Sequence, residues 1–176
     1  MKVVFVCTGN LCRSPMAEGL LLHSFDERGC NGIEVTSVGT WAYADNPAMP
    51  EAIETLRELG IDLSQHKSRA VDESELDEAD VIVVMTSVHI RELKSTVPDV
   101  MSKVLMLKEL SEITPAQVPD DGTPHQRLQA LLTGTKPESR RSLDVDDPIG
   151  LPRGAYERCA RELQAGVDVL VETLCP

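Results

Sequence analysis

Residues 3–18 read VVFVCTGNLCRSPMAE. A short apolar run, 3–6, leads into a loop that begins at Cys7 and contains a glycine and an asparagine. Ser14-Pro15 then gives the signal for the start of a helix. A strand, a tight loop and a helix N-terminus in this order gather main-chain N–H groups around an anion. The stretch therefore predicts a binding site for a phosphate-like group.

Cys7 and Arg13 would give this loop a nucleophile and an anion clamp. A thiol in such a positive field is favoured as the thiolate, which can attack phosphorus and form a phosphocysteine. Arg13 offers a planar fork for two phosphate oxygens, at a helix end where a cation is otherwise unfavourable. Ser14 could donate to the leaving thiolate or cap the helix. The alternatives are a buried structural thiol and an ordinary surface arginine. The predicted phosphate-binding residues are Thr8, Gly9, Asn10, Leu11, Cys12, Arg13 and Ser14.

The rest of the chain alternates strand and helix patterns. Strands are expected at 2–7, 33–38, 80–85 and 103–107, and helices at 15–28, 47–59, 87–95, 125–132 and 153–174. This alternation predicts an α/β fold with a parallel sheet. Ligands in such folds bind beyond the carboxyl ends of the strands, which is where Cys7 would lie. We expect one domain over residues 1–176.

Composition restricts the class of partner. The chain has 17 Lys+Arg against 29 Asp+Glu, a net charge of −12, which argues against nucleic acid and anionic membranes. The start does not resemble a signal peptide, and five scattered cysteines are a poor disulfide framework, so the expected compartment is the cytoplasm. No metal-ligand spacing is found and no cofactor is predicted. Three histidines, His23, His89 and His125, are interpreted as surface residues, and Cys30, Cys159 and Cys175 as packing or surface residues.

The loop resembles the signature of the low-molecular-weight protein tyrosine phosphatases, Cys-x5-Arg followed by Ser or Thr near the N-terminus. The matching residues are Cys7, Gly9, Asn10, Cys12, Arg13, Ser14 and Pro15, and the resemblance extends to Ser37, Trp41, His66, Arg69 and Asp147-Pro148. It implies a three-layer fold in which helices flank a four-stranded parallel sheet. It also implies hydrolysis of phosphotyrosine in phosphorylated proteins.

The resemblance also suggests roles for residues outside the loop. Asp147 would be the general acid that protonates the departing phenolate, because such a phosphatase needs a carboxylic acid there. The alternative is an ordinary Asp-Pro turn, with Asp144 and Asp146 as neighbouring carboxylates. Loop support is expected from Asn10, Ser37 and His66, and a substrate rim from Trp41, Tyr43 and Ile149. Trp41 and Tyr43 could instead be core aromatics.

Cys12 lies five residues from Cys7, so the two thiols could approach disulfide distance. Cys12 is therefore either a redox partner that protects Cys7 from over-oxidation or a small filler.

Two positions give opposite indications of whether the substrate is phosphotyrosine or phosphoarginine. The family usually has an aromatic residue after Asp-Pro, where this chain has Ile149, and that tail is similar to the protein-arginine-phosphatase branch. That branch carries a threonine where this chain has Leu11, which favours phosphotyrosine. Phosphotyrosine is thus the main prediction and phosphoarginine the alternative. An arsenate reductase would need relay cysteines near 85–97, where there are none, and an idle phosphate-binding module would not need all three predicted catalytic residues.

A long connection at 111–142 departs from the family pattern. It carries Lys136, Arg140 and Arg141 on an acidic protein, and it leads to the predicted acid. Long loops in compact domains are often functional. The connection either helps to select acidic phosphoprotein segments or is a tolerated surface insertion.

Overall fold

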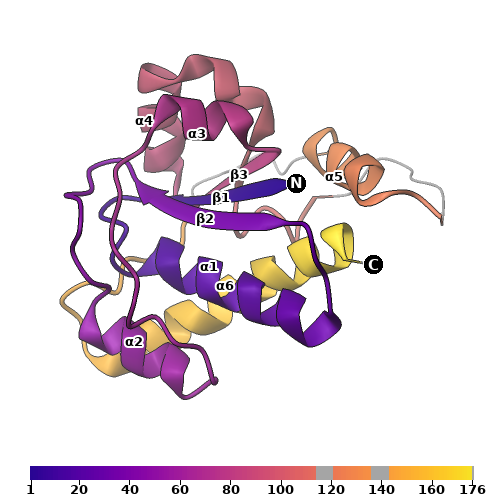
Figure 1. The fold of residues 1–176 in the computed structure, drawn as a ribbon. Coiled ribbons are helices and arrows are strands. Elements are labelled where there is room, and N and C mark those ends of the chain that lie inside the picture. Colours follow the sequence, from indigo (N-terminus) through magenta and orange to yellow (C-terminus); the bar gives the residue numbers. More distant parts are fainter. Residues whose placement is uncertain (114–120, 136–142, 176) are drawn as a thin grey trace.

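The computed structural model describes residues 1–113, 121–135 and 143–175. Four parallel strands form one sheet in the order β2-β1-β3-β4 (Figure 1). The strands are β1 Lys2–Cys7, β2 Glu34–Gly39, β3 Val81–Val84 and β4 Val104–Met106. The register pairs Cys7 with Gly39, so the phosphate loop leaves the carboxyl edge of the sheet beside the end of β2. The predicted α/β class and four-stranded parallel sheet are confirmed.

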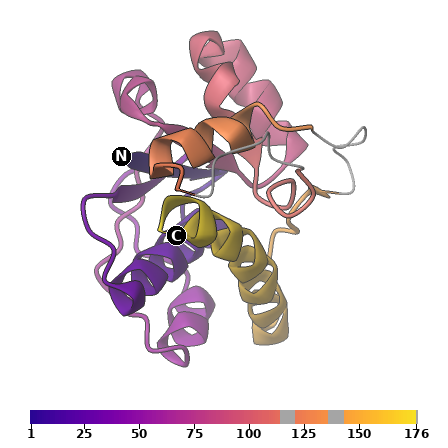
Figure 2. The same ribbon diagram turned by 90° about the vertical axis from the view of Figure 1, so that its right-hand side faces the viewer.

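Helices cover both faces of this sheet. In Figure 1, α1 Arg13–Arg28, α2 Pro50–Arg57 and α6 Arg153–Leu174 lie on one side, and α3 Glu73–Glu78 and α4 Ser87–Thr96 lie on the other. A 3₁₀ helix, η1 Pro98–Lys103, packs against α4. Figure 2 gives the view in which α5 Pro124–Leu132 lies beside the C-terminal part of α6.

The alternation of side chains along β1 creates two cores. Val3, Phe5 and Cys7 face the layer of α1 and α6, whereas Val4 and Val6 face the layer of α3 and α4. Successive residues of a strand point to opposite faces, so a sheet covered on both sides needs an unbroken apolar run. The run at 81–84 in β3 is likewise fully buried.

Most predicted elements differ from the structure by one or two residues at an end, α2 differs more, and two elements were not predicted. α2 begins at Pro50 rather than at residue 47, because a residue that precedes proline is driven out of the helical region and Met49 has ψ 139°. The six-residue α3 was missed, although Asp72 caps it by accepting from the Glu75 main-chain N–H. η1 was also missed. α1 ends where predicted, at Arg28, and the Gly29 that follows it has a left-handed φ of 68°.

One cysteine pair corrects the sequence analysis. Cys30 and Cys175 form a disulfide between the turn after α1 and the end of α6, with their Cα atoms 6.1 Å apart. α1 and α6 pack side by side, which brings two residues 145 positions apart together. The expectation that both are packing or surface residues is wrong, and a reducing compartment stays a prediction. None of the described helices is long and apolar enough to cross a membrane.

Candidate active site

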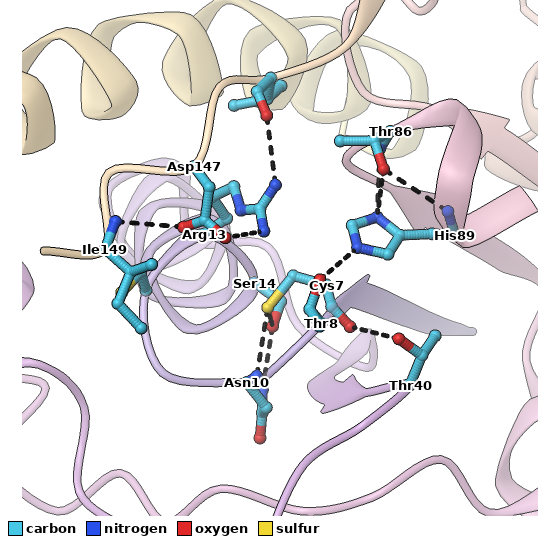
Figure 3. Close-up of polar contacts among 12 residues, drawn as sticks. Cys7, Thr8, Asn10, Arg13, Ser14, Thr40, Thr86, His89, Asp147 and Ile149 are labelled. Atoms are coloured by element: carbon cyan, nitrogen blue, oxygen red, sulfur yellow. Dashed lines mark hydrogen bonds and ion pairs between the residues drawn. The ribbon is translucent and has the colours of Figure 1, made fainter. Parts of the chain in front are cut away.

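The Cys7 thiol lies at the base of the predicted phosphate loop, where β1 ends and α1 begins six residues later. Cys7 is 2% exposed, and its Sγ accepts from the Asn10 main-chain N–H at 3.2 Å (Figure 3). Ser14 Oγ lies 3.0 Å from the same sulfur. The Ser14 hydroxyl also accepts from Asn10 Nδ2 at 2.9 Å, so its own proton points away from Asn10. That proton has two acceptors within reach, the Val38 carbonyl at 3.3 Å and the Cys7 sulfur at 3.0 Å, so the hydroxyl can donate to a Cys7 thiolate.

Asn10 holds the loop in its turn. It is fully buried and has a left-handed φ of 53°, a conformation that asparagine tolerates better than most residues. Its Nδ2 also donates to Ser37 Oγ at 2.8 Å, and its Oδ1 accepts from the Arg69 main-chain N–H at 2.8 Å. His66 Nε2 donates to the Asn10 carbonyl at 2.8 Å. The three residues predicted to support the loop are thus brought together by hydrogen bonds.

Gly39 is a site residue that the sequence analysis did not single out. A Cβ on this residue would lie 2.5 Å from the Thr8 carbonyl oxygen and 2.9 Å from the Asn10 nitrogen. Only a residue without a Cβ allows the end of β2 to approach the loop so closely. Its place at the end of an expected strand, directly after Val38, was the available signal.

Arg13 and Asp147 meet although 134 residues separate them. Arg13 NH2 lies 2.5 Å from Asp147 Oδ2, and Arg13 NH1 donates to the Val145 carbonyl at 3.2 Å (Figure 3). The arginine side chain is 5% exposed and the aspartate side chain 42% exposed. Asp147 Oδ1 also accepts from the Ile149 main-chain N–H at 3.2 Å. The predicted clamp and the predicted acid therefore lie in one cluster with the loop.

The two neighbouring carboxylates are engaged elsewhere or exposed. Asp144 Oδ1 accepts from the Ser87 main-chain N–H at 2.7 Å, at the start of α4. Asp146 is exposed and borders a small pocket together with Asp147 and Arg158. Neither forms an ion pair with Arg13 in the described part of the chain, which favours Asp147 as the candidate acid.

His89 is not a surface residue, and that prediction is wrong. It is 1% exposed, and its Nε2 lies 3.0 Å from Thr8 Oγ1. Its Nδ1 accepts from the Thr86 main-chain N–H at 3.1 Å. Burial and then the charge of Arg13 lower the pKa of His89 to about 4, against the opposing effect of carboxylates led by Glu92. Thr86 also caps α4, and this cap three residues before His89 was the signal in the sequence. His23 is partly exposed and His125 is exposed, as predicted.

The predicted rim residues face solvent. Trp41 is 71% exposed, Tyr43 85% and Ile149 49%, so the alternative of core aromatics is excluded for the first two. The Trp41 main-chain N–H donates to the Thr8 carbonyl at 2.9 Å, and its indole Nε1 donates to Glu92 Oε1 at 2.9 Å. Trp41 is therefore joined both to the phosphate loop and to α4. A substrate-facing role for the three residues stays a prediction.

Cys12 is buried within the loop. It is 4% exposed, and its Sγ lies 3.9 Å from the Tyr156 hydroxyl. Burial raises the pKa of this thiol to about 12, which disfavours the reactive thiolate. If Cys12 has a redox role, its thiol would therefore attack an oxidised Cys7 slowly.

Two further predictions concern the basic residues of the long connection and metal binding. The basic residues Lys136, Arg140 and Arg141 lie outside the described residues. No group of three His, Cys, Asp or Glu side chains that could hold a metal ion occurs in the described ranges.

Comparisons with known proteins agree with this geometry. The family described as low molecular weight phosphotyrosine protein phosphatase matches residues 2–121. The probable low molecular weight protein-tyrosine-phosphatase EpsP of Ralstonia solanacearum is 30% identical over 169 residues, 96% of this chain and 92% of that protein. The protein-arginine-phosphatase of Geobacillus stearothermophilus is 31% identical over 173 residues, 98% of this chain and 95% of that protein. The crystal structure of a low molecular weight protein tyrosine phosphatase from T. tengcongensis superposes with a TM-score of 0.77 at 34% identity and covers 98% of both chains.

Proposed function

The chain belongs to the low-molecular-weight phosphotyrosine protein phosphatase family, and on this premise we propose that it hydrolyses phosphotyrosine in proteins. Cys7 is the nucleophile, Arg13 the phosphate clamp and Asp147 the general acid. The proposed location is the cytoplasm, and the proposed partner is a phosphorylated protein.

One observation carries the proposal. The Nε–H of Arg13 is buried and has no hydrogen-bond partner among the described residues, whereas NH1 and NH2 are both engaged. A buried donor without a partner is costly, so its retention indicates a group that it binds in another state. Nε and NH2 form one edge of the guanidinium, and that edge matches two oxygens of a phosphoryl group. The same side chain lies within one cluster with the Cys7 loop and with Asp147.

The first step transfers the phosphoryl group to the enzyme. Phosphate oxygens that bind Arg13 compete with Asp147 for the guanidinium, which frees the carboxylate to take up a proton from the solvent and to face the leaving oxygen. The Cys7 sulfur attacks phosphorus, an S–P bond forms, and the P–O bond to the tyrosine ring breaks. Asp147 gives its proton to the departing phenolate. The main-chain N–H groups of the loop and Arg13 stabilise the charge on the three equatorial oxygens.

The second step releases phosphate. Asp147, now a carboxylate, accepts a proton from a water molecule that attacks phosphorus. The S–P bond breaks, and the electron pair returns to the Cys7 sulfur. The Ser14 hydroxyl, 3.0 Å from this sulfur, stabilises the leaving thiolate together with the Asn10 N–H. The products are inorganic phosphate and the enzyme with the Cys7 thiolate restored.

Phosphoarginine is the second candidate substrate, and one residue favours it. Ile149, half exposed directly after Asp147-Pro148, cannot stack on a phenol ring as an aromatic residue does. A protein-arginine-phosphatase also matches nearly the whole chain. Leu11 opposes this alternative, because its side chain packs against the main core and offers no polar group to a phosphoramidate. Phosphotyrosine therefore remains the main proposal.

The test compares wild type with Cys7→Ser on p-nitrophenyl phosphate. The variant is expected to show no turnover above background, since serine is a poor nucleophile near neutral pH, while it still binds inorganic phosphate through Arg13 and the N–H groups. Cys159→Ser is the matched control, because it makes the same exchange at another buried thiol outside the loop. Substantial turnover by Cys7→Ser would contradict the covalent mechanism. Parallel kcat/KM values for phosphotyrosine and phosphoarginine peptides then decide between the two substrates.

A further inference from the structure

The hydrogen bonds of His89 determine which of its ring nitrogens carries a proton. A main-chain N–H can only donate, so the bond from Thr86 N–H to Nδ1 at 3.1 Å requires that Nδ1 has no hydrogen. The ring is neutral near pH 7, because burial and Arg13 hold the pKa of His89 at about 4. The single ring proton is therefore on Nε2, the atom 3.0 Å from Thr8 Oγ1.

This tautomer orients the hydroxyl of Thr8. Nε2–H donates to Oγ1, so the proton of the hydroxyl must point in another direction. No second hydrogen bond to Oγ1 is formed by the described residues. Thr8 is exposed, whereas most other residues of the loop are buried, namely Cys7, Asn10, Cys12, Arg13 and Ser14. Figure 3 shows Thr8 beside Cys7 and His89, and the exposure of Thr8 leaves its hydroxyl proton accessible to a group that binds at the loop.

We propose that Thr8 donates a side-chain hydrogen bond to an oxygen of the bound phosphoryl group, and that His89 is a positioning residue that orients this donor. The proposal rests on the function proposed above and adds one donor to the main-chain N–H groups and Arg13. His89 does not touch the substrate. It acts as a fixed neutral donor, and a cationic His89 could not accept from Thr86 at Nδ1.

The placement of His89 explains why a buried histidine serves this purpose. His89 lies in the first turn of α4, and its ring spans the distance from the Thr86 main chain to the phosphate loop. One neutral imidazole accepts a hydrogen bond from the Thr86 main-chain N–H at Nδ1 and donates one to the Thr8 hydroxyl at Nε2. An aliphatic residue would leave the Thr86 N–H without this acceptor and the Thr8 hydroxyl free to rotate.

The experiment is a double-mutant cycle on Thr8 and His89 with p-nitrophenyl phosphate. Thr8→Val keeps the β-branched shape and removes the hydroxyl, and we expect kcat/KM to fall roughly tenfold, as for the loss of a hydrogen bond to a charged group. Thr8→Ser should restore most of the activity. His89→Leu should cost about as much as Thr8→Val in the wild-type background and nothing further in the Thr8→Val background. His89→Gln, which can still donate at the position of Nε2, should recover part of the loss.

Direct binding of inorganic phosphate by calorimetry keeps the two proposals distinguishable. It should weaken roughly tenfold in Thr8→Val, and this measurement does not need turnover. A wild type that binds phosphate but hydrolyses no aryl phosphate would refute the proposed function alone. Val100→Ala, a buried change in the core beside α4, controls for loss of stability and should leave kcat/KM unchanged. Equal activity and phosphate affinity of Thr8→Val and wild type would overturn the inference. An effect of His89→Leu that persists in the Thr8→Val background would overturn the role of His89.

Discussion

Replacing Asn10 by alanine should lower the free energy of unfolding, because Asn10 holds the phosphate loop in its turn. The alanine variant loses two hydrogen bonds that Nδ2 donates, to Ser14 and Ser37, and one that Oδ1 accepts from Arg69. It also places an ordinary L-residue at φ 53°. All of this occurs in a fully buried position, where water does not replace the lost partners.

The magnitude follows from these contacts. Two buried hydrogen bonds and one partly buried hydrogen bond, at about 1 kcal/mol each, give about 3 kcal/mol. The left-handed conformation adds about 1 kcal/mol for alanine relative to asparagine. The free energy of unfolding should therefore fall by about 4 kcal/mol, a large part of the 5–15 kcal/mol typical of a domain. Asn10→Gly loses the same hydrogen bonds but tolerates the positive φ, so its loss should be roughly 1 kcal/mol smaller.

Urea unfolding followed by far-UV circular dichroism measures these differences. Asp45→Ala is the matched control, because Asp45 is the other described non-glycine residue with a positive φ, 66°, and it is exposed. It should cost about 1 kcal/mol for the backbone alone. A loss below about 1 kcal/mol in Asn10→Ala, or equal losses in the alanine variants at the two positions, would show that the buried hydrogen bonds do not stabilise the loop.

Four further predictions test the site. Asp147→Ala should lower kcat by ~10²–10⁴, most for aryl phosphates with poor leaving groups, and an equal loss for every leaving group would argue against the acid role. Mild peroxide should inactivate the wild type reversibly through a Cys7–Cys12 disulfide detectable by mass spectrometry, and a Cys12→Ser variant that recovers as fully would reduce Cys12 to a filler. Gly39→Ala would bring a Cβ to 2.5 Å from a main-chain oxygen of the loop, and should cost 1–3 kcal/mol of stability by urea unfolding, to order of magnitude, as well as activity. The pKa of His89 is lowered to about 4 in the folded state, so the unfolded state binds the proton first as the pH falls, and the contribution of neutral His89 to the free energy of unfolding is complete above about pH 6.5 and is lost towards pH 4. Between these pH values the free energy of unfolding should fall by about 3 kcal/mol more in wild type than in His89→Gln. Parallel pH profiles of stability for the two proteins would refute the lowered pKa.

The sequence by itself determined the elements whose causes are local. The loop after β1 was predictable because a strand, a tight turn and a helix start are encoded in sixteen consecutive residues. α6 was predicted to the residue, since a long helix with one apolar face carries a strong periodic signal. Short elements such as α3 carry little of that signal, and its cap at Asp72 is one side chain among many acidic ones.

Only the tertiary structure decided which distant groups meet at the loop. The order β2-β1-β3-β4 places the ends of three strands beside one another, so that residues after β2 and β3 reach the residues after β1. Asn10 forms a hydrogen bond with Ser37, 27 positions away. Thr8 does so with His89, 81 positions away, and Arg13 with Asp147, 134 positions away. Periodicity along a chain indicates which face of a helix is apolar but not which elements pack against it. For this reason the sequence predicted a solvent-exposed His89 in α4, whereas the structure buries it against the phosphate loop.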